Sequence, residues 1–465
     1  MHMTKLPLGE QDLPKPLPLR KLIGPSFILL GLGLGSGEVI LWPYLASNYG
    51  LGIAWAIVIG LTMQFFINME VERYALAFGE SVFVGFARLA KLLPAWFILS
   101  TFLGFGWPGI GLGGATLLGS AFNIENVQII GIVIFLLIGV ILTFGKTIYK
   151  TVERMQMVLI GIGVPFILLL TFYLADASDF VVLAQGVVGQ GEGFTFLPMG
   201  IAIAAFLGAL AYSGAGGNLN LAQSCYIRDK GYGMGKYADK ISGLFRKEGK
   251  QKFKITGNKF PETPQNLANY KKWWKVINAE HFIVFWCLGL ITMLTLALLA
   301  YVTSYGQGGD TEGIMFVITE ASTIGMKTFP QLGIIFLIVT GIMLCATQLT
   351  VLDSTSRIMT ENFLLLTRGE EFQVSKVYYT ILWIQILFGI TVFSIGFDQP
   401  LTLIVLGAVL NAFAMFVYSG LLILLNNKMF SKALRPAIWR NVVMALTFVF
   451  FGVFSFMTIS EKLFG

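Results

Sequence analysis

Long apolar runs recur along this chain from Leu22 to its C-terminal end. A helix needs roughly 20 apolar residues to cross the hydrocarbon core of a bilayer. Soluble domains carry about 25% charged residues, whereas only 12% of the 465 residues here are charged and 56% are hydrophobic. The runs therefore predict an all-α polytopic membrane protein. We expect one transmembrane domain over residues 1–465, with the lipid bilayer as its surroundings.

The runs predict eleven membrane spans. They are expected at residues 22–48, 51–79, 94–121, 127–145, 151–175, 197–227, 278–304, 330–356, 376–396, 400–426 and 436–459. The segment before the first run is polar and rich in proline, and the first run is too long for the core of a cleavable signal peptide.

The basic residues predict how the spans are oriented, because cytoplasmic loops are enriched in lysine and arginine. Thirteen basic residues lie between Arg228 and Lys275, whereas only Lys327 and Lys462 of the 32 fall on the opposite side. That side carries acidic residues instead: Asp176, Asp179, Glu192, Asp310, Glu312 and Asp398. We expect a protein of the plasma membrane, with residues 1–21 in the cytoplasm and the C-terminus on the outside. The net charge of +7 then reflects topology and implies no nucleic-acid partner.

The basic segment 228–277 is the largest polar stretch, and two interpretations of it stay open. One is a basic cytoplasmic linker. The other is a short interfacial helix, since Trp273 and Trp274 stand between lysines and suit an anionic lipid surface.

Several function classes have little support in the sequence. Cys225, Cys287 and Cys345 show no paired spacing, so neither a disulfide framework nor a zinc site is expected. Only His2 and His281 are present, which leaves little for a histidine-based metal site or a nucleophile triad. The segment GLGLGSG has glycine at every second position, unlike the GxGxxG spacing of a dinucleotide fingerprint. We expect neither an enzyme nor a cofactor, and the sequence leaves the oligomeric state open.

Two spans are interrupted in a matching way. In the first, Gly35-Ser36-Gly37 precedes Glu38, and in the sixth, Gly214, Gly216 and Gly217 precede Asn218. Spans one and six are equivalent positions in a five-plus-five inverted repeat, in which discontinuous helices hold the substrate near the membrane midplane. We expect both spans to be discontinuous. The first repeat would cover residues 22–175 and the second 197–426, followed by an extra helix at 436–459.

Glu38 is the residue in these spans with the strongest indication of a functional role. It lies deep in an apolar run, where carboxylates usually face a cavity, pair with a cation or carry protons. The alternative is a neutral glutamic acid that donates a hydrogen bond to exposed carbonyl groups, or one on the outer vestibule wall.

Other polar residues within the spans are open to two interpretations. Thr347, Gln348 and Asn411 lie at midplane depth and are either accessory site residues or interhelical hydrogen-bonding groups. Asp353, Arg357 and Glu361 follow i, i+4 spacing and predict a charge ladder. Glu70, Glu72 and Arg73 lie near the inner end of the second span and form either an interfacial ion cluster or part of a proton path. The glycines of residues 104–114 indicate close helix contacts.

The first span resembles the first-helix segment of the Nramp family of divalent-metal transporters. The family reads Gly-Pro-Gly-Phe and, seven residues later, Asp-Pro-Gly-Asn. Here the first place holds Gly24-Pro25-Ser26-Phe27, and the second holds Gly35, Ser36, Gly37 and Glu38. The family's sixth-span motif Met-Pro-His-Asn-Leu falls on Ala215, Gly216, Gly217, Asn218 and Leu219, and residues 359–364 are similar to its Met-Glu-Gly-Phe-Leu ending. The resemblance implies an inverted-repeat fold of eleven or twelve helices and ion-coupled transport by alternating access.

The departures from the family pattern bear on the substrate. Gly35 stands in the place of the metal-binding aspartate and Ala215 in that of the methionine, while the two histidine places hold Gly217 and Ala222. Asn218 is kept, and Glu38 replaces an asparagine. Without a sulfur ligand, a site built on oxygen favours hard ions such as Mg²⁺ or Mn²⁺.

These observations predict a secondary transporter of the Nramp type for a divalent cation. The expected substrate or ion site comprises Gly35, Ser36, Glu38, Ala215, Gly217 and Asn218, with Glu38 and Asn218 as the metal ligands and Gln348 and Asn411 as accessory residues. Two alternatives remain: a proton- or sodium-coupled carrier of a small organic solute, and a non-transporting sensor that signals through residues 228–277.

Overall fold

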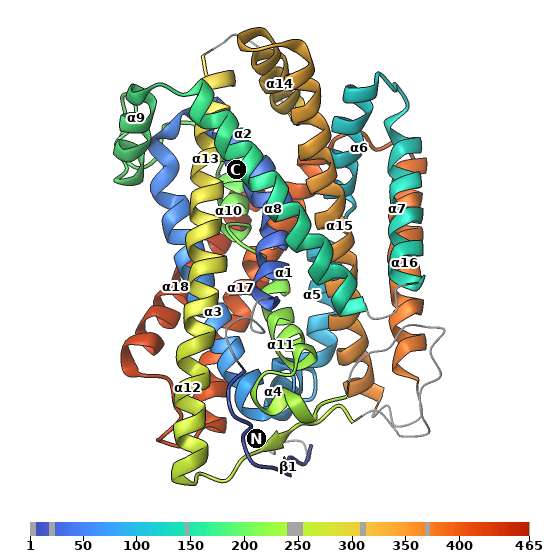
Figure 1. Ribbon diagram of the computed structural model, residues 1–465, viewed down its shortest axis with the longest axis vertical. Helices are drawn as coiled ribbons and strands as arrows, with labels where there is room; N and C mark the ends of the chain where they lie inside the picture. Colours follow the sequence, from blue (N-terminus) through green and yellow to red (C-terminus); the bar gives the residue numbers. More distant parts are fainter. Residues whose placement is uncertain are drawn as a thin grey trace.

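The computed structural model describes residues 6–17, 24–144, 148–239, 254–306, 313–367 and 373–464, which form a bundle of helices (Figure 1). Ten helical stretches within these residues are long and apolar enough to cross a membrane. The sixth predicted span is divided into two shorter helices and completes the eleven that the sequence predicts.

The first five spans follow one another closely. Their elements are α1 (Pro25–Gly33), η2 (Leu34–Leu41) and α2 (Trp42–Tyr49); η3 (Leu51–Ile53) and α3 (Ala54–Phe78); α5 (Leu93–Phe105) and α6 (Gly109–Phe122); α7 (Val127–Phe144); and α8 (Ile148–Leu174). Two short helices lie between or after them, α4 (Val82–Leu89) and α9 (Ala177–Val187).

The remaining spans include the divided one. Their elements are α10 (Ile203–Ala211) and α11 (Leu219–Lys230); α12 (Pro264–His281), η5 (Phe282–Cys287) and α13 (Leu288–Ser304); α15 (Pro330–Thr367); α16 (Val374–Ser394); α17 (Pro400–Met429); and α18 (Ile438–Phe464). The 3₁₀-helix η4 (Gly233–Tyr237) and α14 (Met315–Lys327) connect them. One parallel pair of short strands joins β1 (Gly9–Glu10) to β2 (Asn258–Lys259).

Burial separates a central helix from peripheral ones. The most apolar window of the first span is 94% buried inside the protein, whereas that of α18 is 28% buried. Exposed apolar side chains on the outer helices, such as Leu446 and Phe456, suit contact with lipid tails. The first span therefore forms the centre of the bundle.

The two ends of the bundle differ as the charge pattern predicts. The strand β1 and the helix α4 lie at the end that carries the N-terminus, and α9 and α14 lie at the opposite end, toward the C-terminus (Figure 1). The acidic residues Asp176 and Asp179 are therefore at the end remote from β1. Which end faces the cytoplasm stays a prediction, and Lys146, Asp310 and Glu312 lie outside the described residues.

The first span is not unwound, contrary to the prediction. It continues without a break from Pro25 to Tyr49, and residues Leu34–Leu41 form a π-helix. Pro43 has no backbone N–H and its ring crowds the carbonyl of Val39, so a regular α pattern is interrupted at this point. The N–H of Trp42 instead donates to the Gly37 carbonyl, five residues back. The glycine-rich segment thus stays hydrogen-bonded, in a widened helix of the kind often found at functional sites.

The segment around Trp273 and Trp274 is not a separate interfacial helix. It belongs to one helical stretch, Pro264–Ser304, that continues into the seventh span, because no proline or glycine interrupts residues 265–288. Trp273 is buried, and its indole N–H donates to the Pro14 carbonyl at 2.8 Å. Trp274 packs on the guanidinium of Arg73 at 4.0 Å. The rest of the predicted linker includes residues 240–253, which lie outside the described part.

The glycines of residues 104–114 make the close contacts that the sequence predicts. A Cβ atom on Gly104 would lie 2.2 Å from Asn411 Oδ1, and one on Gly114 would lie 2.8 Å from Cys345 Sγ. The sequence analysis did not predict that the third span consists of two helices, which are separated at residues 106–108. Pro108 explains this interruption, since it cannot donate to the helix ladder.

Candidate functional site

The sixth span is interrupted as predicted, between α10 and α11. Gly216 and Gly217 have φ values of +74° and +44°, which glycine adopts at low cost. The carbonyl groups of residues 212–215 accept no hydrogen bond from the described residues. Unpaired carbonyl oxygens in a membrane core are costly unless they line a cavity or a polar site. The break therefore presents a row of oxygen atoms inside the bundle.

Gln64 of α3 ties the two ends of this break together. Its Nε2 donates to the carbonyls of Leu210 and Ala211 at 3.2 and 3.0 Å. Its Oε1 accepts from the Gly216 N–H and from Asn220 Nδ2, both at 3.1 Å. The sequence analysis missed this residue. The available signal was an uncharged polar side chain within the otherwise apolar second span.

The π-helix η2 lies directly against the break. A Cβ atom on Gly37 would be 1.7 Å from the carbonyl oxygen of Tyr212, and one on Gly33 would be 2.9 Å from that of Gly214. On its other face, Gly35 lies against Thr347 of α15, at 2.5 Å for a Cβ atom. Gly33 and Gly37 therefore serve backbone-to-backbone contact between the first and sixth spans, and Gly35 makes room for the Thr347 side chain. Ser36 lies within the same π-helix.

Glu38 is fully buried on this π-helix. It has no exposed surface, and neither carboxylate oxygen has a hydrogen-bond partner among the described residues. At about 100° per residue, Glu38 lies on the helix arc between the face of Gly37, toward Tyr212, and the face of Gly35, toward Thr347. A buried carboxylate with no partner is expensive unless it is protonated or binds a cation.

Two amide side chains flank the break. Asn218 Nδ2 donates to Ser100 Oγ and Thr101 Oγ1 of α5, at 2.8 and 2.9 Å. Asn411 Nδ2 donates to the Gly104 carbonyl and to Tyr212 Oη, both at 2.9 Å. In each case the Oδ1 atom is buried without a partner. Both predicted residues thus offer an amide oxygen that none of the described residues engages.

The structure brings most of the predicted site residues to this junction. Gly217 lies against Asn411, since a Cβ atom there would be 1.9 Å from Asn411 Oδ1. Ala215 is buried in the break itself. No contact between Glu38 and Asn218 is observed, so their joint role as ligands stays a prediction.

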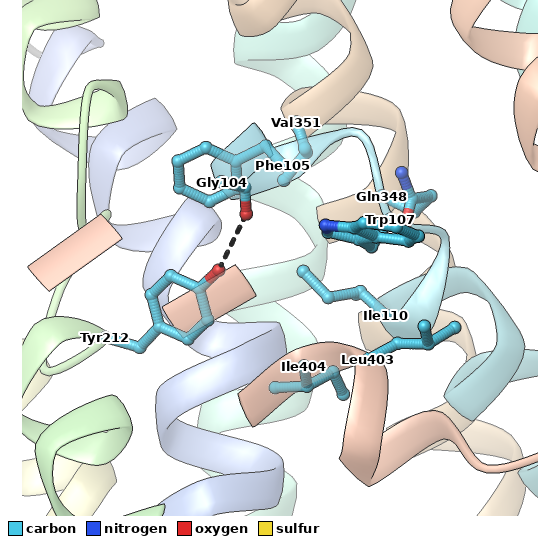
Figure 2. A pocket seen from close by; sticks show the side chains of 9 residues that line it. All are labelled: Gly104, Phe105, Trp107, Ile110, Tyr212, Gln348, Val351, Leu403 and Ile404. Carbon is cyan, nitrogen blue, oxygen red and sulfur yellow. Dashed lines mark hydrogen bonds between the residues drawn. The ribbon is translucent and has the colours of Figure 1, made fainter. Parts of the chain in front are cut away.

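A small cavity lies beside the break, with a volume of about 10 Å³. Tyr212 and Trp107 form opposite parts of its wall, and Gln348 completes it from α15 (Figure 2). Gln348 Oε1 accepts from the Gly111 N–H at 3.0 Å, so this accessory residue also joins two helices. The volume suffices for about one water molecule. This cavity is therefore too small for a substrate in this conformation.

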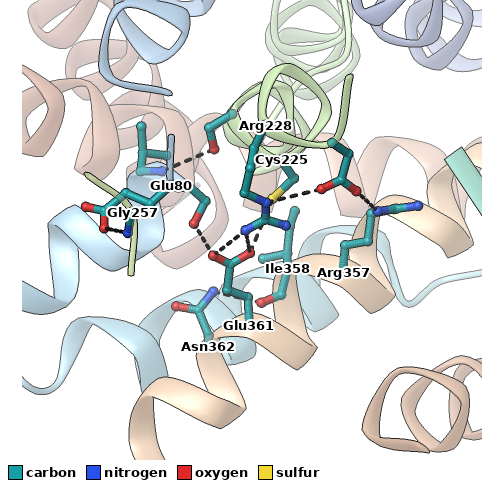
Figure 3. Close-up of polar contacts among 12 residues, drawn as sticks. Glu80, Cys225, Arg228, Gly257, Arg357, Ile358, Glu361 and Asn362 are labelled. Carbon is teal, nitrogen blue, oxygen red and sulfur yellow. Dashed lines mark hydrogen bonds and ion pairs between the residues drawn. The ribbon is translucent and has the colours of Figure 1, made fainter. Parts of the chain in front are cut away.

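An ion-pair network surrounds Arg228 of α11 (Figure 3). Arg228 of α11 pairs with Glu361 of α15 at 3.0 Å and with Asp229 at 3.1 Å. Arg357 pairs with Asp229 at 2.6 Å and with Asp353 at 2.9 Å. The predicted ladder on α15 is confirmed for Asp353 and Arg357. Glu361 instead pairs with α11, so the network connects the half-helix after the break to the eighth span.

The second predicted ion cluster is divided in the structure. Glu70 pairs with Arg73 at 2.7 Å and with Arg440 at 2.9 Å. Glu72 points elsewhere and accepts from Gln223 Nε2 at 2.7 Å. The two glutamates are two residues apart on one helix and therefore face different neighbours.

No family model matches the chain, and no curated protein matches its sequence. Solved structures match it in fold. A variant of the manganese transporter of Eremococcus coleocola superposes with a TM-score of 0.70 at 13% identity, covering 97% of this chain and 90% of that chain. A nucleobase-cation-symport-1 family transporter, in a closed conformation with bromovinylhydantoin bound, has a TM-score of 0.57 at 14% identity, covering 98% of this chain and 94% of that chain.

These likenesses show the fold. The chain is an integral membrane protein with the inverted-repeat fold of secondary transporters, and the predicted Nramp-like architecture is confirmed. The matched structures are transporters, not enzymes. The repeat boundaries at 22–175 and 197–426, with the extra helix at 436–459, stay predictions.

Proposed function

We propose that this chain is a secondary active transporter that carries a divalent metal cation by alternating access. The observation that carries the proposal is Glu38, a fully buried carboxylate with two unpartnered oxygens on a π-helix that abuts the break in the sixth span. Residues in the equivalent places of the Nramp family bind metal. The substrate would sit where the first and sixth spans meet.

The available donors favour a hard cation. They are the Glu38 carboxylate, the free amide oxygens of Asn218 and Asn411, and the carbonyls of the break. Ala215 supplies no sulfur, and oxygen ligands suit Mg²⁺ or Mn²⁺. Among the residues that the structure describes, no three His, Cys, Asp or Glu side chains converge to hold a metal ion. We therefore expect the cation to keep part of its water shell, as Mg²⁺ commonly does.

The cavity beside Tyr212 would have to widen for either substrate class, and more for an organic solute than for a cation. Pockets for drug-sized ligands have volumes of about 300–1,000 Å³, whereas the cavity beside Tyr212 measures about 10 Å³. A proton- or sodium-coupled organic carrier would need this region to widen substantially on binding.

Calorimetric titration of the purified protein with Mn²⁺, Mg²⁺ and Ca²⁺ tests the proposal. We expect saturable binding of at least one of these ions by the wild type. In Glu38→Gln the affinity should fall at least about tenfold, a loss of about 1.4 kcal/mol, because the charged ligand is removed and the shape is kept.

Glu320→Gln is the matched control, since Glu320 is also a buried glutamate but lies on α14, away from the break. It should bind the cation as the wild type does. Equal affinity of the wild type and Glu38→Gln would contradict the role of Glu38. If no metal binds, the substrate is of another class, and organic solutes become the next candidates.

A further inference from the structure

A second group of buried polar side chains lies away from Glu38, toward the end of the bundle that carries the N-terminus. Gln223 Nε2 of α11 donates to Glu72 Oε1 of α3 at 2.7 Å, and His281 Nδ1 lies 3.3 Å from the same oxygen. Ser26 Oγ of α1 lies 2.9 Å from His281 Nδ1 and donates to Glu280. We call Glu72, Gln223, Glu280 and His281 the inner polar cluster. All four are at most 6% exposed.

Each member of the inner polar cluster has one atom without a hydrogen-bond partner among the described residues. These atoms are Glu72 Oε2, Gln223 Oε1, Glu280 Oε1 and His281 Nε2. The three oxygens are acceptors, and His281 Nε2 is also an acceptor when Nδ1 carries the imidazole proton. The cluster therefore lacks hydrogen-bond donors or a cation for these four acceptor atoms.

Among the described residues, no ion pair joins a lysine or arginine to a member of this cluster. Lys230 and Arg440 carry the positive charges that interact at long range with Glu280 and Glu72, respectively. Their direct ion pairs are with other residues: Lys230 Nζ pairs with Glu153, and Arg440 pairs with Glu70. Tyr232, the other titratable group facing Glu280 and Glu72, brings no positive charge. The His281 ring is stacked between two phenyl rings, those of Phe65 at 5.5 Å and Phe285 at 4.6 Å.

We propose that Glu72, Glu280 and His281 form a proton-binding site that couples cation transport to proton movement, an inference that rests on the proposed function. A proton needs only one lone pair, whereas a metal ion needs several converging ligands, and no such convergence is found among the described residues. A proton taken up from water on Glu72 Oε2 turns that acceptor into a donor. It neutralises one of two carboxylates that share a dry site.

The geometry connects this site to the break. Gln223 holds Glu72 and lies five residues after Asn218 on α11, about 7 Å along the helix. Protonation of Glu72 changes the tie between α3 and α11 from a charged hydrogen bond to a neutral one, which is weaker. The proton therefore biases the position of α11, the half-helix that follows the break. Glu38 binds the cation beside the break, at the other end of α11.

Infrared difference spectroscopy across the physiological pH range tests the site without any transported substrate. We expect the carbonyl-stretch band of protonated carboxyl groups to change with pH in the wild type. This change should be reduced in Glu72→Gln and in Glu280→Gln. Glu320→Gln, as control, should leave the Glu72 contribution intact. Identical pH-difference spectra for the wild type and both cluster variants would overturn the inference.

Cation accumulation in proteoliposomes, with the membrane potential clamped, tests the coupling. A gradient of one pH unit should change the accumulation ratio of the wild type by about tenfold per coupled proton. In Glu72→Gln the ratio should return to about one while downhill uptake continues. Unchanged accumulation in Glu72→Gln, or accumulation driven by sodium instead, would overturn the coupling. A wild type that moves no divalent cation defeats the proposed function, and the infrared titration still decides whether the site binds protons.

Discussion

A single methyl group at Gly37 tests how closely the first and sixth spans meet. A Cβ atom there would lie 1.7 Å from the Tyr212 carbonyl oxygen, which is backbone and cannot swing away. Overpacking of this kind costs about 1–3 kcal/mol. We expect Gly37→Ala to lower the melting temperature and to abolish most cation uptake.

Gly161→Ala is the control for this substitution, because a Cβ atom on Gly161 of α8 meets nothing within 4 Å. Alanine is favoured over glycine in a helix by about 1 kcal/mol, so this variant should be as stable as the wild type or slightly more so. Equal melting temperatures and uptake for the two variants would contradict the close approach of the spans.

At the residue scale, the sequence predicts polar positions better than it predicts their partners. Glu38 stands out because a carboxylate in an apolar run is rare. Gln64 and the inner polar cluster are not predicted, because their members come from three spans and only packing brings them together. His281 was set aside as one of two histidines, and its stacking on Phe285 has no signature in the sequence.

At the scale of elements, the network around Arg228 should hold α11 against α15. Arg228→Met leaves the Glu361 and Asp229 carboxylates buried without this cation, and breaking a buried pair costs about 3–5 kcal/mol. We expect a marked drop in melting temperature. The double variant Arg228→Met with Glu361→Met should recover much of it, since it also removes one of the unpaired charges. A single variant as stable as the wild type would show that the pairs do not hold these helices.

The two glycine-rich interruptions show what local sequence does and does not determine. Both predicted a break, yet only the sixth span has one. There, two adjacent glycines adopt positive φ values and Gln64 stabilises the freed backbone groups. In the first span the glycines keep negative φ values. The chain stays helical there, as a wider π-helix that precedes Pro43. Glycine permits unwinding, and neighbouring side chains decide whether it occurs.

At the scale of the whole molecule, the charge asymmetry predicts which end faces the cytoplasm. Ser178 on α9 and Ala433 after α17 are both exposed. They lie near opposite ends of the bundle. We expect Ser178→Cys to react with a membrane-impermeant maleimide in intact cells and Ala433→Cys to react only after permeabilisation. The native cysteines give little background, since Cys225 is buried and the other two are partly buried. The reverse labelling pattern would invert the predicted orientation.

Most of the architecture could be predicted, because apolar length and spacing in a membrane protein reflect the thickness of the bilayer. Each predicted span coincides with helical structure at its position, but the seventh and eighth helices are longer than predicted, and the eighth continues to Thr367. The extent of the seventh span was underestimated, since the apolar pattern fades before residue 278 while the helix continues back to Pro264. Its polar half is stabilised by contacts with the N-terminal segment, such as Trp273 with Pro14, which local sequence does not reveal.

The most direct test of the central claim is uptake of Mn²⁺ and Mg²⁺ into proteoliposomes that contain a divalent-sensitive dye. We predict saturable uptake by the wild type and by Glu320→Gln, and at least about a tenfold loss of initial rate at low cation concentration in Glu38→Gln, equivalent to about 1.4 kcal/mol. Uptake by Glu38→Gln equal to that of the wild type would contradict the account, because the unpartnered carboxylate between the first and sixth spans would then have no part in moving the cation.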